Sequence, residues 1–418
     1  MRRVVITACG VTSPIGNDFM QFSEGLFAGD TGARLLEELF GSDLHDVPVA
    51  FGAPVKNTAE VARARQCLEN PHKSTTFALA ALQQILVTAP DVVCRASLQC
   101  GVGIGQLLPD LADLVEAAAA FHDALLQRGN NAQLRPDHAR ESALFSDAGA
   151  LQLQRVLGLQ GPVRNFVSAC AAATQACIQA CEEVLFGADV AIGGGHDSLL
   201  SVAGIYLMHE LGTLSTNSRA YRSAVRPFDR ERDGTMIGEG AAYFLFEEAQ
   251  HARQRGAEIM AEVVGYGSSL DGYHVTSPEP TGRAGIRMIE DALAMAGIDG
   301  SRIDYVNAHG TATSMNDAIE TQIIQQSLQG NRPFVSSTKP QIGHLIAACG
   351  AVELAACVAA LRFQRVPPNC NLETPDPECD LRFPELGGPS ATLDYALCNS
   401  FGFGGQNACM ILRRWNAD

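Results

Sequence analysis

The sequence predicts an α/β fold built from two similar halves. Short β-branched runs alternate with helical segments along the chain, which is the pattern of α/β proteins. Residues 166–170 (FVSAC) open into an alanine-rich helical segment, and residues 334–338 (FVSST) precede a second one. Each follows a run that ends in glycine and leads to a glycine-rich strand end. We therefore expect a duplication, with 1–250 as one half and 251–418 as the other.

The elements of this fold are predicted from hydrophobic periodicity. The predicted strands are 3–7, 101–104, 163–167, 190–193, 242–246, 262–267, 305–308, 334–336, 395–399 and 408–412. The predicted helices are 74–86, 110–126, 171–186, 283–296, 317–328 and 342–362. No Pro/Ser-rich linker or low-complexity tract divides them.

Bulk composition excludes several classes of protein. The 418 residues are 46% hydrophobic and 18% charged, which suits a large core and argues against disorder. The balance of 46 acidic against 30 basic residues gives a net charge of −16. Nucleic acid is therefore not an expected partner, because phosphate neutralisation needs clustered Lys and Arg. The densest basic run consists of Arg219, Arg222, Arg226, Arg230 and Arg232.

The chain is expected to be a cytoplasmic protein without a membrane span. The N-terminal apolar run leads straight into Gly10 and Pro14, so a first strand is favoured over a secretory signal. The longest apolar stretch, 347–361, contains Glu353 and is shorter than the roughly 20 residues that a span needs. The 13 cysteines are scattered without a CxxC pair, so we expect free thiols in a reducing compartment. A structural zinc site is the less favoured alternative, and no metal is expected.

Cys170 is the first candidate for chemistry. It lies where the predicted strand 163–167 turns into a long helix of small residues. Free backbone N–H groups at a helix N-terminus lower the pKa of a thiol and favour the thiolate. The same amides can hold a developing oxyanion. Taken alone, a buried structural thiol is the commoner interpretation of such a cysteine.

His309 is the second candidate. The segment 306–313 (VNAHGTAT) ends a strand and enters a loop, which is a common place for a catalytic side chain. Thr311 and Thr313 offer hydroxyls that could hold a substrate. A hydrogen-bonded structural histidine is the alternative for this residue alone.

His344 is the third candidate. It closes the segment 337–344 (STKPQIGH), which precedes a helix that carries Glu353. Lys339 and Glu353 could pair near the imidazole and fix its tautomer and orientation. A helix-capping histidine and a surface lysine are the alternatives when each residue is considered alone.

The C-terminal segment 399–407 (NSFGFGGQN) needs backbone positions that side chains would obstruct. It could supply an amide to an oxyanion, and its aromatic residues, Phe401 and Phe403, could gate a pocket. A phosphate-binding loop is not favoured because no Lys-Ser/Thr follows. Residues 101–105 (GVGIG) also lack the spacing of a dinucleotide fingerprint.

Taken together, these segments resemble the elongating β-ketoacyl-acyl carrier protein synthases, the ketosynthases of fatty-acid and polyketide assembly. The matching pieces span nearly the whole chain in the order of the family. They are 168–171 (SACA), 227–234 (PFDRERDG), 238–241 (GEGA), 273–278 (YHVTSP), 307–311 (NAHGT), 337–339 (STK), 343–344 (GH) and 399–407.

The resemblance implies a thiolase-like fold, a five-layer αβαβα sandwich of two duplicated halves. It implies that Cys170 accepts the acyl group, and that His309 and His344 promote decarboxylation of the malonyl extender and stabilise the enolate. Lys339 and Glu353 would order the histidines. The remaining implied roles are oxyanion binding by the amides of Cys170 and Phe403, gating by Phe403, and pantetheine binding by Thr311, Thr313 and Thr276.

The resemblance also implies the partners. Substrates would arrive on the phosphopantetheine of an acyl carrier protein, with no tightly bound cofactor. The basic run at Arg219, Arg222 and Arg226 is the predicted docking site for that carrier. The protein would form a homodimer, or a heterodimer with a homologous ketosynthase or chain-length factor. A Cys-His-Asn site would mark the branch that starts chains from coenzyme A, whereas the residue here is His344.

Some positions depart from the common elongating pattern. Residues 118–148 are rich in alanine and charge, and 135–138 (RPDH) replace a more apolar segment. Ala171–Ala173 follow the nucleophile, and Thr235 stands where an aromatic residue is frequent. These changes leave the acyl chain open, so that fatty-acid synthesis and a specialised polyketide or polyene pathway are both considered.

Two other functions remain as alternatives. A degradative thiolase would need a second, acidic cysteine in a Cys-Gly-Gly context, and Cys398 and Cys409 only flank the glycine loop. A chain-length-controlling partner without condensation activity usually lacks the nucleophile, and Cys170 is present.

Overall fold

The computed structural model describes residues 2–40, 47–69, 71–103 and 147–416. In this part of the chain a 10-stranded sheet has the order β10-β9-β11-β12-β8-β1-β7-β6-β4-β5. Its strands are β1 (Val4–Thr12), β4 (Ser97–Val102), β5 (Val163–Phe166), β6 (Val190–Ser198), β7 (Glu239–Glu248), β8 (Ala261–Leu270), β9 (Tyr305–Asn307), β10 (Phe334–Ser336), β11 (Tyr395–Gly402) and β12 (Gln406–Arg413). A small hairpin pairs β2 (Arg34–Leu35) with β3 (Phe51–Gly52).

Thirteen helices accompany this sheet in the described part of the chain. They are α1 (Phe19–Ala28), α2 (Glu37–Phe40), α3 (Ala59–Gln66), α4 (Lys73–Thr88), α5 (Pro90–Val93), α8 (Ala148–Leu157), α9 (Ala172–Leu185), α10 (Val202–Glu210), α11 (Ala249–Gln254), α12 (Arg283–Ala296), α13 (Ser314–Ser327), α14 (Lys339–Ile342) and α15 (Cys349–Phe363).

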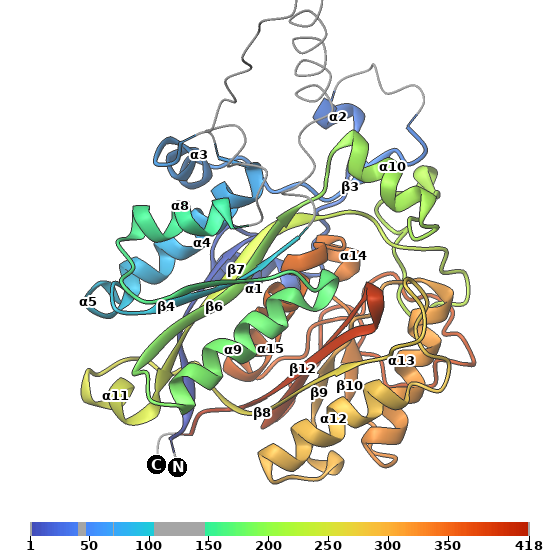
Figure 1. Cartoon of the computed structure of the whole chain (residues 1–418). Helices are drawn as coiled ribbons and strands as arrows, with labels where there is room; N and C mark the ends of the chain where they lie inside the picture. The colour runs from blue at the N-terminus through green and yellow to red at the C-terminus, as the bar shows by residue number, and fades with distance from the viewer. Residues whose placement is uncertain (1, 41–46, 70, 104–146, 417–418) are drawn as a thin grey trace, which may run out of the picture.

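The elements stack in five layers (Figure 1). Helices α4 and α8 cover the outer face of the first half-sheet, and α12 and α13 cover the outer face of the second. Helices α9 and α15 lie between the two half-sheets and contact strands of both. The half-sheets meet where β1 pairs with β8 over Val4–Ile6. The predicted five-layer αβαβα sandwich is confirmed.

The two halves repeat one topology. Strands β1, β4, β5, β6 and β7 have the same spatial order in the first half as β8, β9, β10, β11 and β12 have in the second. Both halves share the same parallel and antiparallel pairings. In this correspondence α9 matches α15, because each follows the third strand of its half. The predicted duplication is thus visible in the fold.

The central helix α15 is buried on every face because it has sheet on both sides, and Glu353 is the charged residue of its buried part. Residues Cys349–Leu361 are all buried. One window, Ile346–Phe363, is long and apolar enough to cross a membrane by length and composition, but 89% of it is buried inside the fold. It is therefore a core helix in the described part of the chain.

The predicted strands all overlap strands of the structure. The predicted helix 342–362 is wrong at its start. Gly343 has φ 74° and Ile346 has φ 47°, so the chain leaves α14, forms a short 3₁₀ turn at Ile346–Ala348 and begins α15 only at Cys349. The predicted helix 110–126, the segment 135–138 and nearly all of 118–148 lie outside the described residues.

Candidate active site

Cys170 lies in a 3₁₀ turn, Ala169–Ala171, that joins β5 to the central helix α9. Ala169 has φ 49°, a left-handed conformation that costs energy for a residue with a Cβ and that marks functional turns. The thiol is 3% exposed. Its position at the start of α9 is the one that the sequence predicts.

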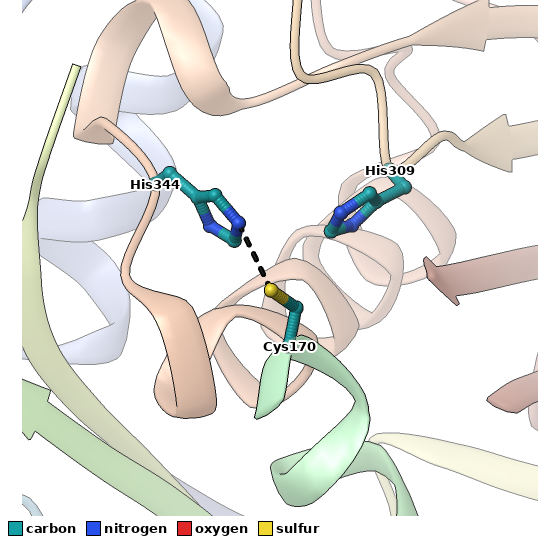
Figure 2. A group of neighbouring side chains, drawn as sticks. All are labelled: Cys170, His309 and His344. Atoms are coloured by element: carbon teal, nitrogen blue, oxygen red, sulfur yellow. Dashed lines mark hydrogen bonds between the residues drawn. The ribbon is translucent and has the colours of Figure 1, made fainter. Parts of the chain in front are cut away.

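His309 and His344 point toward the sulfur from two sides (Figure 2). His344 Nε2 lies 3.1 Å from Cys170 Sγ. The two imidazole rings are 5.3 Å apart between centroids and nearly perpendicular, at 82°. The sulfur and one nitrogen from each ring all lie within 4.8 Å of one another. Cys170 thus lies beside two histidines that follow it by 139 and 174 positions, so residues of the first half and of the second meet at one site.

The loop that carries His309 is held by a buried carboxylate. Glu320 of α13 is 1% exposed, and it accepts the backbone N–H groups of His309 and Gly310, each at 2.8 Å. Burial raises the pKa of the Glu320 carboxyl to about 7. These two bonds fix the direction in which the chain leaves β9 and thus the direction of the imidazole.

Lys339 and Glu353 form a fully buried ion pair beside His309. Lys339 Nζ lies 2.5 Å from Glu353 Oε1, and neither side chain is exposed. Lys339 Nζ also donates to the His309 carbonyl and lies 3.4 Å from His309 Nδ1. Burial disfavours the ammonium, but Glu353 outweighs it and raises the pKa of Lys339 above its usual value.

The charged lysine determines the state of His309. An ammonium can only donate, so Nδ1 of His309 accepts and Nε2 carries the hydrogen. Burial, followed by the charge of Lys339, holds the pKa of both His309 and His344 well below the usual value. Both imidazoles are therefore neutral at physiological pH and can act as hydrogen-bond donors toward the cavity.

The predicted lowering of the Cys170 pKa is wrong for this state of the site. Burial raises the pKa of the thiol to about 12, while Lys339 and the N–H of Phe403 favour the thiolate and oppose that rise. The loss of water outweighs the helix terminus because only 3% of Cys170 is exposed. In this state Cys170 is therefore a neutral thiol.

The glycine-rich segment 399–407 lies over Cys170. The backbone N–H of Phe403 donates to the sulfur, and a Cβ at Gly402 would lie 3.2 Å from the Cys170 nitrogen. Glycine at 402 therefore keeps that amide accessible. Gly404, with φ 76°, lets the chain turn back so that its N–H reaches the Val275 carbonyl. Phe403, one of the two residues whose amides are predicted to bind an oxyanion, thus has its N–H at the sulfur of the other.

A cavity of about 230 Å³ opens in front of Cys170. Both histidines and all the predicted substrate-binding and gating residues line it, and these are Thr276, Thr311, Thr313, Phe401 and Phe403. The hydroxyls of Thr311 and Thr313 lie 2.9 Å apart. The Phe401 ring meets the His309 ring edge to face at 6.1 Å between centroids.

Three residues of the site were missed by the sequence analysis. Glu320 and Asp317 lie three positions apart at the start of α13, and both are buried. Asp317 accepts the N–H groups of Phe228 and Ala312, and burial raises its pKa to about 6. Their position directly after the 306–313 segment was the available signal. The third residue, Cys349, contacts His344 and gave no signal in an alanine-rich helix.

The basic run does not form one surface patch. Arg219 and Arg222 are exposed, and Arg222 lines a pocket with Arg34 and Lys56. The Arg226 side chain is only 13% exposed and donates to the Ser223 carbonyl. The Arg232 side chain is only 4% exposed, pairs with Asp376 and donates to the carbonyls of Thr313 and Ser314. Arg232 thus holds the backbone where the 306–313 segment enters α13.

Family comparisons cover most of the chain. Residues 1–252 match the β-ketoacyl synthase N-terminal domain, and residues 260–373 match the β-ketoacyl synthase C-terminal domain. The chain is 35% identical over 425 residues to a 3-oxoacyl-[acyl-carrier-protein] synthase 2 of Synechocystis sp., with 99% of this chain and 98% of that protein covered.

Solved structures show the same likeness. A ketosynthase complex described as "AntDE:AntF (apo): type II PKS acyl-carrier protein in complex with its ketosynthase bound to the hexaketide" has a TM-score of 0.82 at 30% identity, covering 99% of this chain and 100% of that chain. "The ishigamide ketosynthase/chain length factor" has a TM-score of 0.85 at 29% identity, with the same coverage.

Proposed function

Because this chain belongs to the β-ketoacyl synthase family, we propose that it joins an acyl chain on Cys170 to a malonyl unit carried by acyl carrier protein, with loss of CO₂. The chain is thus an acyltransferase that makes carbon–carbon bonds. The observation that carries this proposal is the convergence of Cys170, His309 and His344 on one cavity.

The first half-reaction is acyl transfer to the thiol. The Cys170 sulfur attacks the carrier thioester, forms a new C–S bond and releases the pantetheine sulfur, which takes the thiol proton. Cysteine suits this step because attacking and leaving groups are both sulfur. The N–H groups of Cys170 and Phe403 are the proposed donors to the tetrahedral oxyanion, whose charge they would stabilise.

The second half-reaction is decarboxylative condensation. The malonyl thioester loses CO₂ and becomes an enolate, whose oxygen accepts from Nε2–H of both imidazoles. The α-carbon attacks the acyl carbonyl, and the C–S bond to Cys170 breaks to give a β-ketoacyl carrier protein. The sulfur leaves as a thiolate and takes up one proton from solvent, which restores the resting thiol. Neutral imidazoles suit this task because they donate hydrogen bonds without protonating the enolate carbon.

The cavity residues support delivery of substrates on a pantetheine arm. Thr311 and Thr313 place two hydroxyls at the cavity wall, where they are suited to the amides of such an arm. Thr276 lines the same wall from the 271–280 loop. No tightly bound cofactor is needed, because the thioester itself supplies the leaving group.

The carrier is proposed to dock at the exposed cations. Arg222, Arg34 and Lys56 line one pocket, and Arg219 lies three residues before Arg222. A concentration of positive charge in a chain with net charge −16 favours an acidic partner through complementary potentials. The acyl carrier protein would be that partner.

The assembly and setting are also proposals. We propose a dimer, as homodimer or with a homologous subunit, because β5 ends the sheet of the described residues and large apolar side chains are exposed. Val167, directly after β5, and Phe186, at the end of α9, are 56% and 87% exposed. The thirteen free cysteines support a cytoplasmic, reducing setting. We propose fatty-acid biosynthesis, with a specialised polyketide or polyene pathway as the alternative, and 1–250 and 251–418 as the two halves.

The test is condensation with defined substrates. The purified chain should convert an acyl carrier protein thioester and malonyl carrier protein into a β-ketoacyl carrier protein and CO₂, as seen by mass spectrometry of the carrier. Acyl loading of the chain without any condensed product would contradict the proposal and favour the chain-length-controlling alternative.

A further inference from the structure

A second thiol lies against the far side of His344. Cys349 is the first residue of α15 and is fully buried. Its Sγ is 2.9 Å from His344 Nδ1, and it accepts the backbone N–H of Leu345 at 3.1 Å. The His344 ring therefore lies between two thiols, because its Nε2 is 3.1 Å from Cys170 Sγ.

The broken start of the helix brings Cys349 to this place. Gly343 and Ile346, both with positive φ, turn the chain back after His344. The 3₁₀ turn Ile346–Ala348 then sets the first residue of α15 beside the imidazole that it follows by five positions. A continuous helix would have carried residue 349 away from the ring.

The position of the hydrogen between Cys349 Sγ and His344 Nδ1 follows by elimination. The backbone N–H of Ile346 lies 3.3 Å from His344 Nδ1 and points at it. A backbone N–H can only donate, so Nδ1 presents its lone pair and Nε2 carries the ring hydrogen. Cys349 must then donate its S–H to Nδ1. Burial raises the pKa of Cys349 well above the usual value, which keeps that hydrogen on the sulfur.

We propose that Cys349 is a positioning residue whose S–H, together with the Ile346 N–H, holds His344 in the tautomer that carries hydrogen on Nε2. This inference rests on the proposed function for its kinetic consequence. In that tautomer Nε2–H is aimed at the sulfur of Cys170 and at the place of the enolate oxygen. Cys349 touches no substrate and acts through the ring.

The assignment of hydrogen to Nε2 of the histidines also affects whether this site can bind a metal ion. Cys170, His309 and His344 each offer one ligand atom within 4.8 Å of the others, a grouping that could attract a thiophilic cation. A metal would need the lone pair of Nε2, but Nδ1 of His344 faces two donors and that of His309 faces the Lys339 ammonium. Both rings therefore present hydrogen to the cavity, which disfavours a metal.

The kinetic test compares two cysteines of one helix. Cys349→Ala should lower the rate of malonyl decarboxylation about three- to tenfold, the range for a lost neutral hydrogen bond, with acylation of Cys170 and KM for malonyl carrier protein unchanged. Cys349→Ser should restore the rate, because a hydroxyl also donates. Cys357→Ala is the matched control, since Cys357 is equally buried on α15 and lies near the Leu397 carbonyl at 3.9 Å.

Equal losses in Cys349→Ala and Cys357→Ala would mean a packing effect and would overturn the proposal. An unchanged rate in Cys349→Ala, or a folded Cys349→Ser without recovery of the rate, would overturn it too.

A second readout does not depend on catalysis. In ¹⁵N-histidine NMR of the substrate-free protein, with His344→Gln to assign the signals, His344 should show hydrogen on Nε2. Cys349→Ala should raise the fraction with hydrogen on Nδ1, because only the longer Ile346 contact at 3.3 Å then opposes that tautomer. A wild-type spectrum with hydrogen on Nδ1 would refute the assignment even if condensation is observed. A chain that never decarboxylates malonyl thioesters would refute the proposed function and leave the tautomer to be decided by the spectrum.

Discussion

Lys339 and Glu353 form an ion pair with Nζ and Oε1 2.5 Å apart, and neither side chain has any exposed surface. Removal of one member of such a pair leaves an uncompensated charge in the core, which costs about 3–5 kcal/mol. Glu353→Gln should therefore lower the free energy of unfolding by about that amount, as measured by denaturant titration. It should also slow decarboxylation, because Lys339 contacts His309 at Nδ1 and at the carbonyl.

The control for this prediction removes both charges. Lys339→Met combined with Glu353→Leu should recover most of the stability, because apolar groups of similar volume often replace buried pairs without loss. Decarboxylation should stay low in the double variant, since the donor to His309 is gone. If the Glu353→Gln protein is as stable as wild type, Glu353 does not compensate the charge of the buried Lys339 ammonium, and the prediction is wrong.

The roles of the three converging side chains can be separated. Cys170→Ala should abolish acyl loading, because the attacking sulfur is gone. His309→Ala and His344→Ala should still load acyl groups but lose decarboxylation by roughly 100-fold or more, the range for donors to a developing oxyanion. Intact mass measures loading and released CO₂ measures decarboxylation. Equal acyl loading of wild type and Cys170→Ala would remove Cys170 as the nucleophile.

Much of the fold and site could be predicted because they depend on local patterns. The predicted strands all overlap strands of the structure, since β-branched runs bounded by glycine are a strong signal. The segments at 166–170, 306–313, 337–344 and 399–407 converge because two copies of one topology place their loops at one interface. The broken helix at His344 was missed, although Gly343 was a visible signal for a turn.

The rest depends on burial, which no local pattern reports. Asp317 and Glu320 look like the solvated face of a helix, yet both are buried and bonded to backbone amides of neighbouring loops. Cys349 looks like another small apolar residue of an alanine-rich helix. The sign of the Cys170 pKa shift was predicted wrongly because a helix terminus is local, whereas loss of water is set by the whole surrounding fold.

The state of the Cys170 thiol predicts the pH dependence of its alkylation. With burial raising the pKa of this thiol to about 12, the thiolate fraction stays small and grows about tenfold per pH unit across the accessible range. Alkylation by iodoacetamide, followed by mass spectrometry of the peptide, should therefore rise without a plateau up to about pH 10. A small-molecule thiol should level off above about pH 9. A plateau for Cys170 below about pH 8 would show a resting thiolate.

Carrier docking at the exposed arginines is testable by charge reversal. Arg219→Glu with Arg222→Glu should raise KM for the carrier protein roughly tenfold at low salt, because two surface pairs worth up to about 1 kcal/mol each are lost. The salt dependence of KM should flatten, since it reports the same charges. The control is Arg287→Glu with Arg332→Glu, which makes the same change of net charge at two other exposed arginines. Equal effects of the two double variants would exclude a specific docking site.

The size of the acyl pocket is expected to depend on Thr235. This residue is 1% exposed and lines the cavity with Cys170 and Met208, and its hydroxyl has no hydrogen-bond partner among the described residues. Thr235→Phe should fill part of the cavity and lower loading of long acyl chains about tenfold or more, while short chains still load, because overpacking costs about 1–3 kcal/mol. Thr235→Val is the matched control, since it removes the hydroxyl at constant volume. Acyl loading is measured by intact mass over a series of chain lengths. If Thr235→Val shifts the chain-length profile as much as Thr235→Phe does, the hydroxyl of Thr235 rather than its volume sets the preference. The preferred acyl chain would then carry a polar group at the point where it passes Thr235.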